Sequence, residues 1–240
     1  MSLEICRHLL IGPALIVAAA LQPDETPKKP TKETVRYLKP SGTDWVLESE
    51  IEVSRDKDGM AATSVTKRGR SQLTLKSKFD AAHRLIDAVV TISGGDQDQT
   101  GRAVRSEDKA RVTRQDGEAT DLDCPPGVIV TSAPDWTDAF FMVRRYDLSR
   151  GGRQEFAGLW IHPTQPPLRL TFAIDRLGEN TVEHDGENVR LDRFAVELRG
   201  GSRYVGWGVA ARLIRLVPQG APQQGIVLDG WQKTTSELRP

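Results

Sequence analysis

The sequence predicts a mainly β protein in which one long, curved antiparallel sheet, a half-barrel, wraps around one principal α-helix. Apolar and polar residues alternate along most of the chain, turn sequences separate the alternating runs, and a single segment changes to helical spacing. Consecutive strands joined by tight turns form a meander. A sheet of about ten strands twists too strongly to stay flat. We therefore expect it to curl around the helix.

The N-terminal residues 1–20 have the pattern of a secretory signal peptide. Arg7 precedes an apolar run over residues 9–21, and Ala18 and Ala20 have the spacing of a cleavage site. The run has 13 residues, whereas a membrane-spanning helix needs about 20. We expect export to a periplasm or out of the cell, with no transmembrane segment in the mature chain. An uncleaved membrane anchor is the alternative.

The rest of the chain divides by composition into three parts. Residues 21–40 are rich in Pro, Lys, Thr, Glu and Asp, which predicts a disordered leader. Residues 41–217 carry the alternating pattern and are expected to form a single β domain. Residues 218–240 are expected to form a linker, one short strand over 226–228 and a polar tail.

The charge balance bears on the class of partner. The chain has 33 Lys and Arg residues against 33 Asp and Glu residues. A balanced surface does not attract polyanions, so a nucleic-acid partner is not expected.

Cys124 is the one thiol left after removal of the signal peptide, so the mature chain has no internal disulfide.

The first alternating run extends from Trp45 to Val53, with Glu48 and Glu50 on the opposite face. The residues of one phase, Trp45 among them, are expected to face the core. A change of phase within residues 189–198 predicts a bulge near Asp192 or Arg193. Further strands are expected within 73–79, 86–92, 168–175, 189–198, 204–207 and 212–216. Turns are expected at Asp58-Gly59, Gly94-Gly95, Asp116-Gly117, Leu177-Gly178, Asp185-Gly186 and Gly200-Gly201.

The principal helix is predicted over Asp135 to Leu148. Residues 132–135 read Ser-Ala-Pro-Asp, which is typical of a capped helix start with proline just inside it. Large apolar residues then recur at spacings of three and four, and Gly151-Gly152 can end the helix.

A curved antiparallel sheet around a helix, in an exported chain without disulfides, resembles the lipoprotein-carrier half-barrels LolA and LolB and related exported bacterial domains. The resemblance covers residues 34–217 and lies in the order of elements, including the closing pair formed by residues 204–207 and 212–216. It implies an acyl chain or similar apolar ligand under the sheet.

Large aromatic residues on the helix and on nearby strands are the candidate ligand-binding residues. We expect an apolar or amphiphilic, lipid-like ligand, or a protein partner, between the sheet and the helix, and no cofactor. The candidates are Trp136, Phe140, Phe141, Trp160 and Trp207.

Two alternatives to this ligand site remain. The first is a structural or interaction domain with a filled core, acting through the polar sheet face or an edge strand. The second is a hydrolase that uses Cys124 or a bound calcium ion. The spacing of Asp96, Asp98, Thr100, Gly101 and Glu107 is close to that of a twelve-residue calcium loop, but a polar hairpin loop is the preferred interpretation. No catalytic residue and no metal ligand is predicted.

Overall fold

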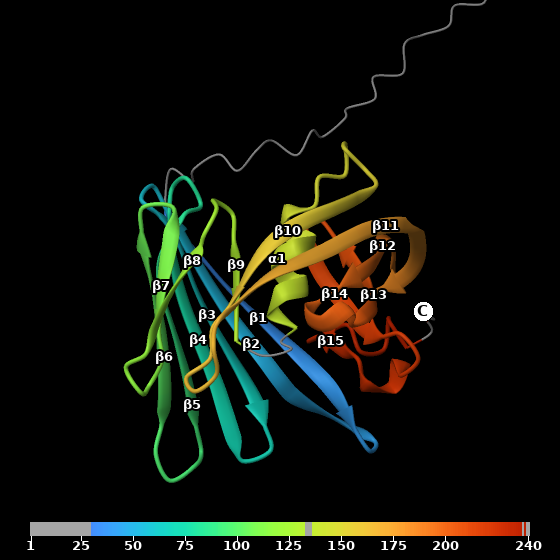
Figure 1. Ribbon diagram of the computed structural model, residues 1–240. Coiled ribbons are helices and arrows are strands. Elements are labelled where there is room, and N and C mark those ends of the chain that lie inside the picture. Colours follow the sequence, from blue (N-terminus) through green and yellow to red (C-terminus); the bar gives the residue numbers. More distant parts are fainter. Residues whose placement is uncertain (1–29, 133–135, 237, 239–240) are drawn as a thin grey trace, which may run out of the picture.

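The computed structural model describes residues 30–132, 136–236 and 238 (Figure 1). These residues form one sheet of 15 strands and one α-helix. The strand order is β8-β7-β6-β5-β4-β3-β2-β1-β15-β14-β13-β12-β11-β10-β9. All neighbours are antiparallel except β9 and β10, which are parallel. The predicted mainly β fold is confirmed, with more strands than expected and with the sheet not closed into a barrel.

The elements follow in chain order. The first half of the sheet contains β1 (Thr31–Ser41), β2 (Asp44–Asp56), β3 (Gly59–Arg68), β4 (Ser71–Asp80), β5 (Leu85–Ser93), β6 (Gln99–Ser106), β7 (Lys109–Thr113) and β8 (Ala119–Asp123). The second half contains β9 (Ile129–Thr131), α1 (Thr137–Arg145), β10 (Arg153–Trp160), β11 (Leu168–His184), β12 (Glu187–Glu197), β13 (Arg203–Val209), β14 (Arg212–Pro218) and β15 (Ile226–Leu228).

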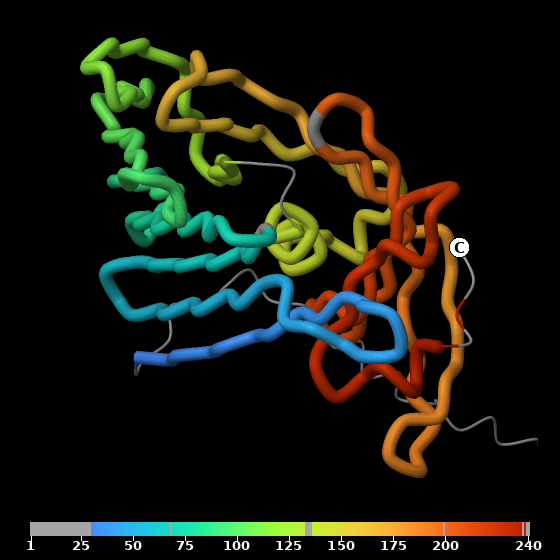
Figure 2. The backbone as a smooth tube through the Cα atoms, turned by 90° about the horizontal axis from the view of Figure 1, so that it is seen from below, coloured from blue at the N-terminus to red at the C-terminus, as the bar shows by residue number. Residues whose placement is uncertain are grey.

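The two halves of the sheet curl toward each other around α1, as the view from below shows (Figure 2). The Gln115 N–H donates a hydrogen bond of 2.8 Å to the Pro163 carbonyl, and Arg169 Nη1 lies 2.6 Å from Asp123 Oδ2. A Cβ atom on Gly101 of β6 would lie 3.1 Å from the His162 carbonyl oxygen. The loop after β10 therefore packs on β6 and β7, although no strand ladder joins the two ends.

Residues 31–40 form β1, so the leader predicted over residues 21–40 is wrong for this part; residues 21–29 lie outside the described residues. Val35 and Tyr37 are buried, and Arg36 Nε lies 2.7 Å from Glu50 Oε2 on the outer face. Two buried residues are enough to hold this strand in the sheet, because β1 forms backbone hydrogen bonds with a neighbour on each side, β2 and β15. Composition alone did not show this pairing.

The helix is shorter than predicted. It begins at Thr137 and ends at Arg145, because Tyr146 has an extended backbone with ψ of 121°. Residues 133–135, which include most of the predicted cap, lie outside the described residues. Every residue from Thr137 to Val143 is buried, which explains why its apolar residues do not lie on one side only.

The predicted turn at Leu177-Gly178 is wrong, because both residues lie inside β11, a strand of 17 residues. Arg176 pairs with Phe194 and Gly178 pairs with Arg193, so Leu177 is the extra residue of a bulge. A bulge was predicted near Asp192 or Arg193; the structure has one opposite Arg193, but the extra residue belongs to β11 and not to β12. Leu177 consequently points out and is 47% exposed.

The C-terminal part is more ordered than a linker and a polar tail. The predicted short strand is present as β15, which joins β1 to β14 at the centre of the sheet. Beyond it, Thr235 and Leu238 are buried. Arg215 Nη1 donates to the carbonyls of both residues, at 3.2 Å for Leu238. The segment 229–236 is thus attached to the sheet.

The hairpin between β13 and β14 has a two-residue turn without glycine. Ala210 and Ala211 have φ of 48° and 60°, a region that costs an L-residue about 1 kcal/mol or more. We expect Ala211→Gly to raise the free energy of unfolding by roughly 0.5–1 kcal/mol in urea titrations. Ala221→Gly is the matched control: φ at Ala221 is −141°, so glycine should lower stability there. Equal effects at the two sites would contradict the expectation.

Candidate functional site

The five candidate residues from the sequence lie around α1, but most of them are inside the core. Phe140 and Trp207 have no exposed surface, and Trp160 is buried. Phe141 packs edge-on against Phe140 at 5.1 Å between ring centroids, and Trp136, which is partly buried, packs edge-on against Tyr204. Whether these residues bind a ligand stays a prediction.

The polar atoms of two of these side chains have partners within the protein. Trp160 Nε1 donates to the Ser132 carbonyl at 2.8 Å, and Trp207 Nε1 donates to Asn180 Oδ1 at 3.0 Å. The cavity that lies against Val143 and Tyr146 measures about 20 Å³, which is close to the space for one water molecule. This cavity lies at the C-terminal end of α1 and is too small to hold an organic ligand.

A much larger space lies outside the core, and we call it the Trp45 groove. One wall is residues 180–183 of β11, and the other is formed by Leu238 and residues 230–234 of the C-terminal segment. Trp45 projects into the groove from the hairpin of β1 and β2. Its volume is about 1350 Å³, and it is open to solvent. The structure thus brings together three segments that are distant in sequence. It joins Trp45 to none of the five predicted residues.

Trp45 was predicted to face the core, and this prediction is wrong. Its side chain is 43% exposed. The register shifts between Tyr37 and Leu38, which pair with Ser49 and Leu47, so Glu48 is the extra residue of a bulge. One extra residue reverses the alternation. Trp45, which lies before the bulge, therefore faces the opposite side of the sheet from Ser49 and Ile51, which lie after it. A strand pattern without a visible bulge could not show this.

Side-chain contacts hold the walls of the Trp45 groove in place. The His184 ring stacks on the Trp231 ring with centroids 3.7 Å apart and planes inclined by 14°. His184 Nδ1 and Thr234 Oγ1 are 2.8 Å apart. These contacts join the end of β11 to the C-terminal segment directly. The groove is consequently preformed, as ligand sites usually are.

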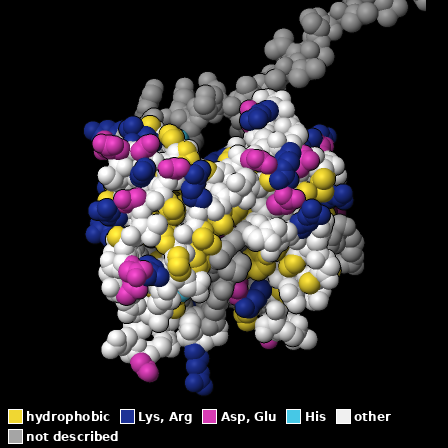
Figure 3. Space-filling view, in the orientation of Figure 1, with side chains coloured by type: hydrophobic (Ala, Val, Ile, Leu, Met, Phe, Trp, Pro, Cys, Tyr) yellow, Lys and Arg dark blue, Asp and Glu magenta, His cyan; other side chains and the backbone are white. Residues whose placement is uncertain are grey.

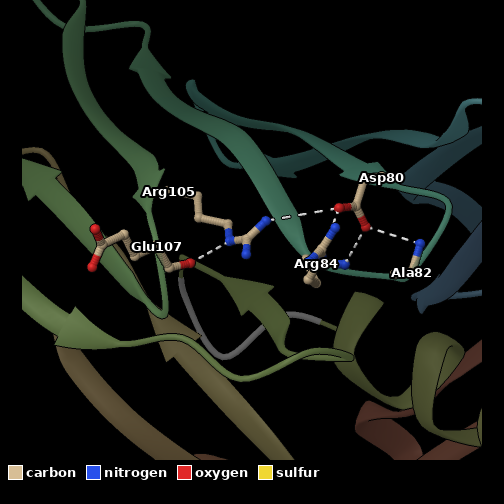
Figure 4. Close-up of polar contacts among 5 residues, drawn as sticks. All are labelled: Asp80, Ala82, Arg84, Arg105 and Glu107. Carbon is tan, nitrogen blue, oxygen red and sulfur yellow. Dashed lines mark hydrogen bonds and ion pairs between the residues drawn. The ribbon is translucent and has the colours of Figure 1, made fainter.

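A second cluster of polar side chains lies at the turn between β4 and β5 (Figure 4). Asp80 Oδ1 accepts hydrogen bonds of 2.9 Å from the backbone N–H groups of Ala82 and Arg84, and Oδ2 accepts one of 2.8 Å from Arg84 Nε. Arg105 Nη1 lies 3.7 Å from Asp80 Oδ2, and its Nε donates to the Glu107 carbonyl. Burial disfavours the charged carboxylate, but these hydrogen bonds outweigh it and lower the pKa of Asp80. The cluster joins two adjacent turns.

We expect Asp80→Asn to lower the free energy of unfolding by about 1–2 kcal/mol at neutral pH, because charge-assisted hydrogen bonds are lost. A carboxyl whose pKa is lowered on folding stabilises the protein above its unfolded pKa, about 3.9. This stability is lost as the pH falls through the folded pKa. The difference between wild type and Asp80→Asn should therefore shrink below about pH 4 in urea titrations.

The exposed Asp96 offers a matched control for Asp80. Asp96→Asn should change stability by less than about 0.5 kcal/mol at either pH. A difference between wild type and Asp80→Asn that is the same in acid and at neutral pH would contradict the ionic character of the cluster.

Cys124 lies next to this cluster and is 3% exposed. Burial raises the pKa of its thiol, and Arg105 opposes this shift. A buried thiol that stays protonated at neutral pH is a poor nucleophile. The geometry therefore offers little support for a hydrolase that uses Cys124.

The residues with calcium-loop spacing do not lie together. Thr100 and Gly101 are within β6, and Asp96 and Glu107 lie beyond its opposite ends. Eight residues of strand separate those ends by about 26 Å. Across the described part of the chain, no group of three or more His, Cys, Asp or Glu side chains is placed to hold a metal ion.

Within the same part, no helix is long and apolar enough to cross a membrane.

Comparison with known proteins finds similarity to solved structures, but none to a family model or a curated protein. No family model matches the sequence, and no curated protein matches it. A crystal structure of a DUF1089 family protein from Pseudomonas aeruginosa is similar with a TM-score of 0.45 and 20% identity, covering 70% of this chain and 88% of that one. A β-barrel-like protein of the domain of unknown function DUF1849 from Brucella abortus is similar with a TM-score of 0.48 and 8% identity, covering 83% and 94%. Neither is described as a lipoprotein carrier.

Proposed function

We propose that this chain is an exported, non-catalytic binding protein that holds its ligand in the Trp45 groove. The observation that carries the proposal is the contrast between two spaces. The groove outside the core measures about 1350 Å³, whereas the cavity at the C-terminal end of α1 measures about 20 Å³. Ligand sites are concave, largely preformed and of several hundred Å³. The signal-peptide pattern of residues 1–20 supports export.

A lipid-like ligand between the sheet and the helix, in the manner of LolA and LolB, is the second candidate. It is favoured by the apolar character of α1, since Phe140, Phe141 and Met142 are successive and all buried. The Trp45 groove, by contrast, is open to solvent.

Thermal unfolding of the mature, full-length protein distinguishes the two sites. A ligand at about one hundred times its Kd stabilises the native state by about 2.7 kcal/mol, which raises the Tm by about 5–10 °C for a domain of this size. We would screen neutral oligosaccharides, lysophospholipids and short peptides in parallel against wild type, Trp45→Ala and Phe141→Leu. At least one class should raise the Tm of wild type and Phe141→Leu but not that of Trp45→Ala.

Two results would overturn the proposal. A ligand-induced rise that persists in Trp45→Ala and disappears in Phe141→Leu would place the ligand in the interior. No rise with any of the three classes would contradict a binding function of this kind and favour a purely structural domain.

A further inference from the structure

We infer that the Trp45 groove binds a neutral oligosaccharide, with one pyranose ring lying on the face of the Trp45 indole. The inference rests on the proposed function and names the ligand class of that same site. Three properties of the groove support it: its charge, its hydrogen-bonding groups and its exposed aromatic ring.

Among the residues that the structure describes, the charged side chains that line the groove balance each other. Glu183 comes from β11, Asp185 from the turn after it, Arg193 from β12 and Lys233 from the C-terminal segment. A phosphate or carboxylate ligand would need an excess of positive charge, and a cation an excess of negative charge. The same mixture of signs covers the face of the molecule seen in Figure 3. A neutral ligand fits this lining best.

The uncharged polar residues of the groove can both donate and accept hydrogen bonds. They are Asn180, Thr181, Gln232 and Thr234. The Asn180 amide oxygen already accepts from Trp207 Nε1, which fixes the orientation of the amide and leaves its NH₂ group to donate. Hydroxyl groups of a sugar likewise donate and accept, so they match such a lining in either direction.

Trp45 supplies the apolar contact that a sugar ring needs. Among the large hydrophobic side chains that are exposed on the described part of the chain, Trp45 alone is aromatic. The C–H face of a pyranose packs on an indole ring, and a rigid aromatic ring is an efficient anchor because it loses little conformational entropy. The remaining apolar residues in the described lining are Val182 and Leu238, which are too few to enclose an acyl chain. The volume suits several sugar units rather than one.

The test is a titration of the mature, full-length protein, labelled with nitrogen-15 at tryptophan, with cellohexaose, maltohexaose and chitohexaose. The five tryptophans give separate indole N–H signals in NMR, and Trp45→Phe assigns the signal of Trp45. At least one of the three sugars should shift this signal to saturation. Trp45→Ala should weaken binding of that sugar by about tenfold or more, measured by calorimetry, because the stacking surface is lost. Trp45→Phe should weaken it by less, since a ring remains.

Leu177→Ala is the matched control, because Leu177 is equally exposed but lies outside the groove lining. Its affinity should equal that of wild type. Added salt should leave the affinity of a neutral sugar unchanged. If a lysophospholipid or a short peptide shifts the Trp45 signal and none of the sugars does, the ligand class is wrong and the proposed function stands. If no probe shifts that signal, both are wrong.

Discussion

Phe140→Ala is expected to lower the free energy of unfolding by about 3–5 kcal/mol. The Phe140 side chain is fully buried at the centre of α1, packs edge-on against Phe141, and lies 5.0 Å from the Arg144 guanidinium carbon. Its removal leaves a cavity that a closely packed sheet cannot close. Urea unfolding of wild type and variant, with equal slopes, measures the loss.

The stability loss caused by Phe140→Ala also distinguishes a packed interior from one that contains a ligand cavity. Leu148 lies just beyond α1 and is 42% exposed, so Leu148→Ala, the control, should cost less than about 1 kcal/mol. If Phe140→Ala costs as little as this control, Phe140 lines an unfilled space. The interior site predicted from the sequence would then be favoured over the Trp45 groove.

Gly158→Ala is expected to cost about 2–3 kcal/mol. A Cβ atom at Gly158 in β10 would lie 2.5 Å from the Phe172 ring and 3.0 Å from Leu170 Cβ on the neighbouring strand. Phe172 is fully buried, so its ring has no free space to move into. The clash forces β10 and β11 apart where Gly158 pairs with Leu170.

Gly95→Ala is the matched control for Gly158→Ala, because a Cβ atom there meets nothing closer than the Gln97 carbonyl oxygen at 4.0 Å. Its effect on urea unfolding should stay within about 0.5 kcal/mol. Equal losses at the two glycines would contradict the attribution of the effect to the contact with Phe172.

Local alternation was enough to predict the fold class, because a strand with one buried face repeats with a period of two. The strand at residues 73–79 shows this, since Leu73, Leu75 and Phe79 are all buried in β4. The turns at Asp58-Gly59 and Asp185-Gly186 were also predicted correctly, because both glycines have positive φ.

The errors share one cause, which is pairing between segments distant in sequence. Residues 31–40 have few apolar side chains, and their strand forms because β2 and β15 pair with it on either side. Trp45 and Leu177 face outward because of bulges that appear only when two strands are aligned. The Trp45 groove combines three such segments, so no local pattern could have predicted it.

Hydrogen exchange of the five indole N–H groups, followed by NMR in heavy water, tests most directly that the core is packed and that the groove is the accessible site. Trp160 and Trp207 are buried and donate hydrogen bonds, so their indole protons should exchange only when the protein opens. Trp45 is 43% exposed and should exchange within the dead time. Exchange of Trp160 and Trp207 as fast as that of Trp45 would reveal a water-filled interior and contradict this placement of the site.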